Sequence, residues 1–272
     1  MTGSTAVHRA LECVDEEQEA IRDRGAAFET FAQRVRAVPA KHPGSTRLQR
    51  TVTEMSTTAT QATPPQGSQG SIPSTSAGRC VTISRTFAET VRPHSVADCD
   101  ADESLVETIA AELTEDVAVA LVAESGWTPT LKSAVLEAVS TRRREVESLQ
   151  GLLQRERSAL ETAIEEIDEI VDWLRATADE SLLQCDFDAL QAKHERLEAY
   201  RDRLEARIER RQAQFTESTN RYGPGGTRYR SVVTSVYSDL SVRYPLLSTG
   251  IRLYGICGGC QRAVRSQLTR RI

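Results

Sequence analysis

Residues 139–174, VSTRRREVESLQGLLQRERSALETAIEEIDEIVDWL, are the most informative segment about the fold. Apolar residues return at every seventh position along it, in an unbroken row made of Val139, Val146, Leu153, Leu160, Ile167 and Leu174. A period of seven keeps an apolar seam facing a second helix, as in a coiled coil. A second apolar row is interrupted by two charged residues, Arg142 and Glu156. The pattern predicts one long helix over about 129–176, roughly 70 Å from end to end.

A second heptad row follows after a turn predicted at 177–186. It consists of Leu183, Leu190, Leu197 and Leu204. Two amphipathic helices joined by a short connection favour an antiparallel pair, because each buries its apolar face against the other. We therefore predict an antiparallel coiled-coil hairpin over 129–218, with these two rows as its seam.

The segments before the hairpin differ in composition. Residues 1–38 predict one amphipathic helix that stops at Pro39, since proline lacks a backbone donor and clashes with the preceding turn. Residues 39–80 are rich in Ser, Thr, Gln, Gly and Pro and carry too little apolar surface to offset the entropy of ordering, so we predict a disordered linker. Residues 81–128 form an acidic helical segment. Its helix is expected over about 104–123, with Asp102 or Ser104 as the capping residue.

The C-terminal segment, 227–272, follows the break Tyr222-Gly-Pro-Gly-Gly. Residues 229–240 suit a short helix, although their β-branched side chains leave a strand as an alternative. Pro245 suits the first turn of a final helix. The expected fold class is all-α: a long antiparallel coiled-coil hairpin, additional N- and C-terminal helices, and a disordered linker.

The composition supports long helices more than one thick core. Aromatic residues make up 5% of the chain, hydrophobic residues 39% and charged residues 27%. The apolar runs are too short to cross a bilayer, and the first residues lack the pattern of a signal peptide. Six scattered cysteines do not resemble a disulfide framework. We therefore expect a cytoplasmic protein with reduced thiols and no contact with a membrane.

Charge is distributed unevenly. Residues 98–124 contain nine carboxylates and no Lys or Arg, whereas 219–272 contain nine Arg and one acid, so 9 − 1 = +8. Docking of the basic segment on the acidic one, within a chain or between two copies, is the simpler interpretation. The alternative is contact with a polyanion such as nucleic acid, through Arg262, Arg265, Arg270 and Arg271. No helix-turn-helix, zinc-finger or RNA-binding motif favours that alternative.

Cys257-Gly-Gly-Cys260 is the one motif that suggests chemistry. Two thiols at this spacing can form a redox pair or share a metal ion. A structural zinc site needs about four ligands, and the sequence contains no second pair of this kind. Incidental cysteines are therefore the preferred interpretation, ahead of a redox pair and of a metal shared between subunits. Phosphate-binding loops, dinucleotide fingerprints and paired-histidine zinc motifs are absent, so we expect no catalytic residue, cofactor or metal.

The order of elements resembles an uncharacterised family of haloarchaeal coiled-coil proteins. The residues that carry the resemblance are Leu11-Glu-Cys-Val, Thr86-Phe-Ala-Glu-Thr-Val91, Trp127-Thr-Pro-Thr-Leu-Lys, and Tyr244-Pro-Leu-Leu-Ser-Thr-Gly before an Arg-rich helix. The resemblance implies an α-helical architecture and a salt-adapted cytoplasm, and it carries over no catalytic residue. The Cys257–Cys260 motif and the long linker depart from the family's pattern.

The function expected from these observations is that of a non-enzymatic coiled-coil interaction or scaffolding protein acting through its seam rows. Its expected partner is itself, as a homodimer, or another helical protein. A nucleic-acid-associated regulator that uses the Arg-rich C-terminal helix is the alternative, and a thiol redox sensor is a further one.

Overall fold

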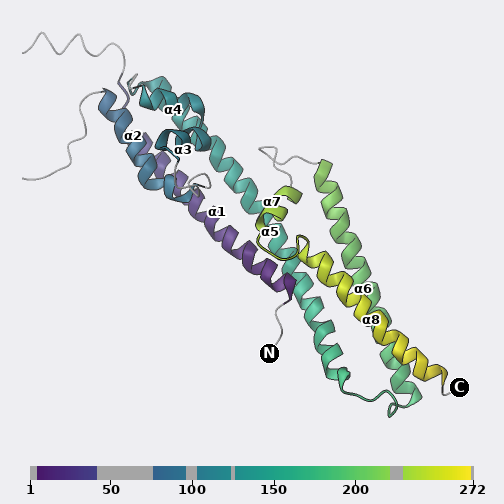
Figure 1. Cartoon of the computed structure of the whole chain (residues 1–272). Helices are drawn as coiled ribbons and strands as arrows, with labels where there is room; N and C mark the ends of the chain where they lie inside the picture. Colours follow the sequence, from purple (N-terminus) through teal and green to yellow (C-terminus); the bar gives the residue numbers. More distant parts are fainter. Residues whose placement is uncertain (1–4, 42–75, 96–102, 124–125, 221–228, 271–272) are drawn as a thin grey trace, which may run out of the picture. The chain divides into compact units, whose positions relative to one another are not determined.

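A computed structural model describes residues 5–41, 76–95, 103–123, 126–220 and 229–270, and every regular element among them is helical. The all-α prediction is confirmed, and residues 229–236 form a helix rather than the alternative strand. The helices are α1 (Ala6–Ala37), α2 (Ser76–Thr90), α3 (Leu105–Glu112), α4 (Glu115–Val122), α5 (Pro129–Ala178), α6 (Phe187–Asn220), α7 (Tyr229–Val236) and α8 (Pro245–Thr269), with a 3-10 turn, η1 (Arg92–His94) (Figure 1).

The chain divides into two compact units. The first, here called the hairpin unit, comprises residues 1–19 and 148–272. The second, here called the acidic unit, comprises residues 20–147. Helices α1 and α5 contribute to both units, whereas α6, α7 and α8 belong to the hairpin unit alone.

In the hairpin unit, α5 and α6 pair in antiparallel fashion. Arg203 lies 2.8 Å from Glu169, and Arg207 lies 2.7 Å from Glu166. The Trp173 ring meets the Tyr200 ring edge-on at 5.5 Å. In these contacts, residues with higher numbers on α5 meet residues with lower numbers on α6. The two helices therefore run in opposite directions, and the predicted helical hairpin is confirmed.

Most of the predicted seam is buried. The buried members are Val139, Val146, Leu153, Leu160, Ile167, Leu190, Leu197 and Leu204. Leu174 is half-buried. Leu183 is 72% exposed, so its assignment to the seam was wrong. The physical reason is local. The Asp186 carboxylate accepts a hydrogen bond from the Ala189 amide at 2.7 Å and caps the start of α6, so Leu183 lies before the helix and not on its apolar face.

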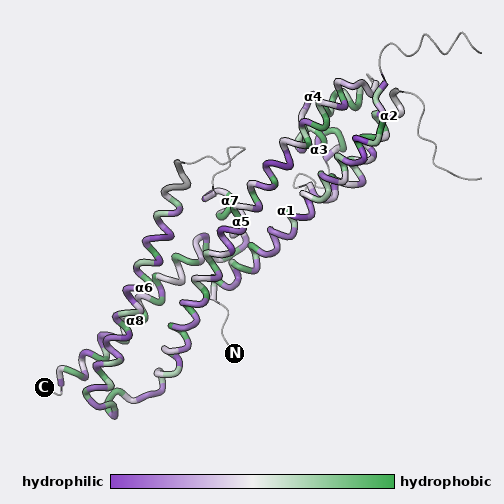
Figure 2. The backbone as a smooth tube through the Cα atoms, turned by 180° about the vertical axis from the view of Figure 1, so that it is seen from behind, coloured by the Kyte–Doolittle hydropathy of each residue, from purple (hydrophilic) through white to green (hydrophobic). Residues whose placement is uncertain are grey.

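Helix α8 packs along α6 (Figure 1). A Cβ atom added to Gly250 would lie 3.2 Å from Cγ1 of Ile208, so the glycine permits this close approach. Apolar and polar residues interchange along each helix (Figure 2), as expected where one face packs on a neighbour and the other meets water.

Helix α1 ends before Pro39, as predicted. In the hairpin unit its first turns pack on α5, with Asp15 2.7 Å from Arg157. In the acidic unit Lys132 donates at the end of α1, to the carbonyl oxygens of Arg36 in its last turn and of Val38 just beyond it, at 2.7 and 2.8 Å. A cation at this position complements the negative end of the helix.

Two predictions in the acidic unit need correction. Residues 42–75 of the predicted linker lie outside the described residues, but α2 already begins at Ser76, inside the range 39–80. Cys80 and Ile83 are fully buried, so the first turns of this helix do carry apolar surface, and Phe87 further along packs edge-on against Phe31 of α1 at 5.5 Å. The single helix expected over 104–123 is two helices, because Thr114 caps α4 by accepting a bond from the Val117 amide.

The start of α3 agrees with the sequence. Ser104 and Glu107 form a capping box in which each side chain accepts a hydrogen bond from the other residue's backbone amide. The same arrangement lowers the pKa of Glu107 below its ordinary value, because the Ser104 hydroxyl and amide both donate to the carboxylate.

A buried carboxylate holds the acidic unit together. Glu112 of α3 is 2% exposed. Its oxygens accept bonds from Arg24 at 2.6 Å, from the Ser95 hydroxyl at 2.6 Å and from Arg142 at 3.1 Å. Arg142, an interruption in the heptad pattern, is therefore the residue that ties α5 to α3. Burial alone raises the pKa of Glu112, but these donors and the two arginine charges outweigh burial and lower it.

Candidate anion-binding site

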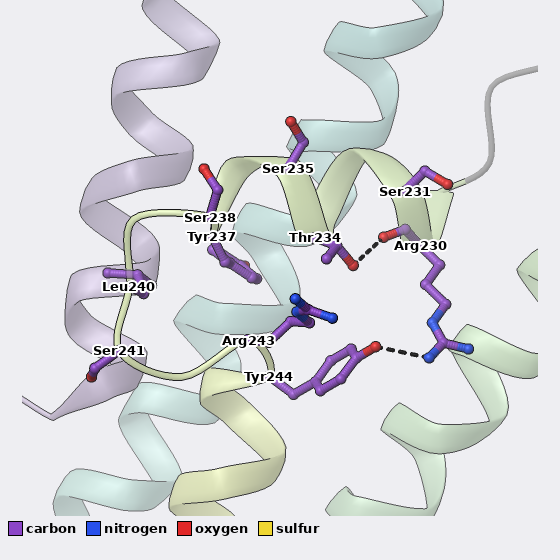
Figure 3. A pocket seen from close by; sticks show the side chains of 10 residues that line it. All are labelled: Arg230, Ser231, Thr234, Ser235, Tyr237, Ser238, Leu240, Ser241, Arg243 and Tyr244. Carbon is purple, nitrogen blue, oxygen red and sulfur yellow. Dashed lines mark hydrogen bonds between the residues drawn. The ribbon is translucent and has the colours of Figure 1, made fainter.

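A hollow of about 750 Å³ lies between α7 and the start of α8. We call it the α7–α8 pocket. Its walls carry two arginines, five serine or threonine hydroxyls, two tyrosines and one leucine (Figure 3). These residues are Arg230, Ser231, Thr234, Ser235, Tyr237, Ser238, Leu240, Ser241, Arg243 and Tyr244.

The position of α7, one wall of the pocket, depends on two tyrosines. The hydroxyl groups of Tyr229 and Tyr237, at the two ends of the helix, both donate to the carboxylate of Glu156 on α5. Glu156 is fully buried and Tyr237 almost so. One carboxylate of the long hairpin helix therefore anchors the whole of α7.

Arg211 of α6 completes this buried cluster. Its two terminal nitrogens donate to the two Glu156 oxygens at 2.8 and 2.5 Å, a bidentate pair. The Tyr229 hydroxyl accepts a bond from Arg211 at 2.9 Å, and the guanidinium lies 4.4 Å from the centre of the Phe215 ring. Buried ions are tolerated when they are paired and fully hydrogen-bonded, and each oxygen of Glu156 has two donors.

The protonation states in the cluster follow from its geometry. Burial raises the pKa of Tyr229 and Tyr237 well above the ordinary value, and the charge of Glu156 raises both further. Both hydroxyls therefore stay protonated and donate. Burial disfavours the charged form of Arg211, but its bond to Glu156 and the carboxylate charge outweigh burial and raise the pKa of Arg211.

The two arginines of the pocket reach it from opposite sides (Figure 3). Arg230 projects from α7 and donates to the Tyr244 hydroxyl at 2.8 Å. The same guanidinium lies 5.7 Å from the centre of the Tyr244 ring. Arg243 comes from the segment before α8, is exposed, and makes no hydrogen bond or ion pair among the described residues. Its five donors are available to a ligand.

The chemistry of the lining favours an anion. The ten residues present guanidinium and hydroxyl donors and include no Asp or Glu that would neutralise the arginines. The N-cap of α8 is Tyr244, whose side chain makes no capping bond. The positive end of a 25-residue helix therefore adds to the field of the two arginines. Guanidinium forks match the oxygens of phosphate and carboxylate groups.

The predicted thiol motif lies elsewhere, in the middle of α8. Cys257 is fully buried and Cys260 is half-buried, and both are free thiols. Burial and the neighbouring Cys260 raise the pKa of Cys257 to about 11. A thiol with a raised pKa forms little of the reactive thiolate at neutral pH, which weighs against the redox-pair interpretation. Among the residues described, no group of three or more His, Cys, Asp or Glu side chains is arranged to hold a metal ion.

The predicted polyanion contacts are only partly described. Arg262 and Arg265 are exposed on α8 and Arg270 is exposed just after it, and none of them lines the α7–α8 pocket. Arg271 lies outside the described residues. The pocket instead uses Arg230 and Arg243, which contribute to the basic charge of 219–272 but have no motif of their own. In the heptad pattern Glu156 interrupts an apolar row, and the sequence offers one clue to its role, the opposite charge of Arg211 on the partner helix.

The fold and the pocket together define an all-α protein with an anchored, donor-lined pocket. The chain belongs to the family described as a domain of unknown function, DUF7260, which it matches over residues 5–261. No curated protein and no solved structure matches the chain. Across the described helices, none is both long enough and apolar enough to cross a membrane.

Proposed function

We propose that this protein is a non-enzymatic binding and scaffolding protein whose α7–α8 pocket holds a phosphate group of its ligand. The observation that carries the proposal is that Arg230 and Arg243 line one hollow together with several hydroxyl groups, and that no acid is among its described lining residues. A phosphate group has three acceptor oxygens and up to two negative charges, so it can take donors from both arginines and several hydroxyls at once.

The same lining residues favour binding of a ligand without catalysis of a reaction on it. A catalysed transfer usually needs a general base or an activated nucleophile, most often His, Asp, Glu, Cys or Lys. None of these residue types is among the ten that line the pocket. The pocket is therefore equipped to hold an anion and orient it.

The surface proposed for interaction differs from the seam rows expected at first. Leu160 and Leu197 are buried within a single chain, so they stabilise the fold and are not offered to a partner. The α7–α8 pocket, in contrast, opens to solvent, and the hydrogen bonds of Tyr229 and Tyr237 to the buried Glu156 hold its α7 wall in place.

A nucleic-acid-associated role is the second candidate, and the exposed arginines of α8 favour it. A duplex would contact Arg262, Arg265 and Arg270 through its phosphates, with an affinity that falls steeply with salt. A haloarchaeal host remains part of the proposal, supported by the near-exclusive use of Arg among the basic residues. A cytoplasmic location also remains part of it, supported by the lack of a membrane-crossing helix among the described residues.

The test is calorimetric titration of the full chain with inorganic pyrophosphate, in phosphate-free buffer at low and high KCl. The change is Arg243→Gln. We expect its affinity to fall by roughly ten- to a hundredfold, because one charge-assisted interaction contributes about 1.5–3 kcal/mol. Arg230→Gln is expected to weaken binding similarly.

Arg252→Gln is the matched control, since Arg252 is exposed on α8 and does not line the pocket. Its affinity should equal that of the unaltered chain. A parallel titration with a DNA duplex uses the triple change of Arg262, Arg265 and Arg270 to Gln. Absence of pyrophosphate binding would exclude the pocket as an anion site. Binding that is lost in the triple variant but kept in Arg243→Gln would also exclude the pocket, and it would favour the nucleic-acid role.

A further inference from the structure

The two arginines of the α7–α8 pocket are held very differently. Arg243 makes no hydrogen bond or ion pair among the described residues, whereas Arg230 donates to the Tyr244 hydroxyl at 2.8 Å. The Arg230 guanidinium also lies 5.7 Å from the centre of the Tyr244 ring. A long side chain loses rotamer freedom when it binds a ligand, so an arginine that is already held binds at a smaller entropic cost.

Tyr244 is itself supported from behind. Its ring meets the Phe215 ring of α6 edge-on at 5.6 Å, and Phe215 is buried. The next residue along the chain, Pro245, opens α8 and is buried as well. Both the ring and the backbone of Tyr244 therefore have a fixed support, and its hydroxyl has a defined place in the pocket wall.

This support leads back to the buried carboxylate that anchors α7. Arg211, which is paired with Glu156, has its guanidinium 4.4 Å from the centre of the Phe215 ring. Phe215 supports Tyr244, and Tyr244 holds the tip of Arg230. The helix that carries Arg230 and the side chain that holds its guanidinium are thus fixed to the same buried cluster.

The contact with Tyr244 leaves Arg230 able to bind an anion. A guanidinium has five N–H donors, and a single hydrogen bond from the Arg230 side chain is found among the described residues. A hydroxyl acceptor, unlike a carboxylate, leaves the positive charge uncompensated. Figure 3 shows Arg230 and Tyr244 meeting tip to tip at the pocket, with Arg243 reaching toward it from another side.

We propose that Tyr244 is the positioning residue of the α7–α8 pocket, whose hydroxyl holds Arg230 in the orientation that meets a phosphate group. Arg243, which has no such support, adjusts to the ligand after it has entered. The inference rests on the proposed function, because it describes how the same site takes its ligand. Its consequence is specific: the Tyr244 hydroxyl affects binding through Arg230 and independently of Arg243.

The first experiment is a double-mutant cycle measured by calorimetric titration of the full chain with inorganic pyrophosphate. Tyr244→Phe removes the acceptor oxygen and keeps the ring that packs on Phe215. We expect its affinity to fall roughly two- to tenfold, the effect of one hydrogen bond. In an Arg230→Gln background the same change should have no further effect, whereas in an Arg243→Gln background it should lower the affinity by the same factor.

Tyr254→Phe is the matched control. Arg201 donates to the Tyr254 hydroxyl at 2.7 Å, and its guanidinium lies 4.6 Å from the centre of that ring. The change therefore removes the same atom from the same kind of pair on α8, but Tyr254 does not line the pocket. Its affinity should equal that of the unaltered chain. No loss in Tyr244→Phe, or an equal loss in the Arg230→Gln background, overturns the positioning role.

The second experiment uses no ligand and so separates this inference from the proposed function. Phenylglyoxal modifies arginine side chains, and peptide mass spectrometry gives the rate at each position. Arg230 and Arg243 are both exposed, yet Arg243 should react several times faster because Arg230 is engaged with Tyr244. In Tyr244→Phe the rate at Arg230 should rise toward that of Arg243, and the rate at Arg243 should stay the same.

The two readouts together distinguish the possible failures. Pyrophosphate binding that needs both arginines, with an unchanged Arg230 rate in Tyr244→Phe, overturns the positioning role alone. The expected rates without any pyrophosphate binding overturn the proposed function, and with it the role of Tyr244 toward a phosphate group.

Discussion

The structural role of Glu156 depends on the side chains that surround it in the fold. In the linear pattern it interrupts an apolar row of α5. In the fold it is fully buried and accepts bonds from Arg211, Tyr229 and Tyr237. A buried carboxylate without such donors would cost several kcal/mol, so the four side chains stabilise the fold only as a set.

Replacing Glu156 with Gln should therefore destabilise the protein strongly. The change leaves Arg211 buried without its counter-charge, and breaking a buried pair typically costs about 3–5 kcal/mol. Tyr237→Phe removes one donor to a charged acceptor and should cost about 1.5–3 kcal/mol. Urea denaturation measures both. Glu165→Gln, an exposed site on the same helix, should change the free energy of unfolding by less than about 0.5 kcal/mol. A cost for Glu156→Gln no greater than this control would contradict the role of the cluster.

At the scale of the elements, the hairpin is stabilised by its apolar rows and held in register by polar contacts. Leu160 and Leu197 are almost completely buried, while the ion pairs of Glu166 and Glu169 with α6 lie nearer the surface. Exposed ion pairs contribute little free energy, so burial of the leucines supplies most of the pairing free energy.

Leu160→Asp or Leu197→Asp should accordingly disrupt the hairpin. Each change removes a buried apolar side chain, which costs about 2–5 kcal/mol as a cavity, and adds a buried charge. Far-ultraviolet circular dichroism should show lost helicity or a much lower melting temperature. Leu183→Asp is the same chemical change at an exposed member of the predicted row and should leave both signals intact. Unaltered melting in Leu160→Asp would show that this row does not hold the hairpin.

At the scale of the whole molecule, each unit is built around one buried carboxylate with arginine partners. The hairpin unit has Glu156 with Arg211, and the acidic unit has Glu112 with Arg24 and Arg142. Each carboxylate binds side chains from helices that are far apart in the sequence and so joins those helices. Arginine suits this role because its planar fork donates several bonds and keeps its charge when buried.

The acidic unit should lose stability in acid. The pKa of Glu112 is lowered in the folded state, so its contribution to stability is present above the ordinary carboxyl pKa and is lost as pH falls through the lower folded value. Urea midpoints between pH 7 and pH 3 should fall for the unaltered chain. Glu112→Gln should be less stable at pH 7 but should change less over this range. Equal pH dependence in the two proteins would show that Glu112 does not carry the effect.

The helical class, the hairpin and several helix boundaries could be predicted from the amino-acid sequence. Pro39 ends α1, Ser104 caps α3 and Thr128-Pro129 opens α5, because capping and proline effects act over a few residues of chain. The heptad rows also identified most of the hairpin core, since periodicity states which face of a helix is apolar.

The identity of the buried charged residues and the position of the pocket could not be predicted from the sequence, because both depend on how the helices pack. Glu156 and Arg211 are 55 positions apart, and Glu156 and Tyr237 are 81 apart, so no local pattern links them. Arg230 and Arg243 face one hollow because α7 is anchored and the chain turns before α8. Burial of an ion depends on the donors that surround it in space, and those donors come together only when distant helices pack.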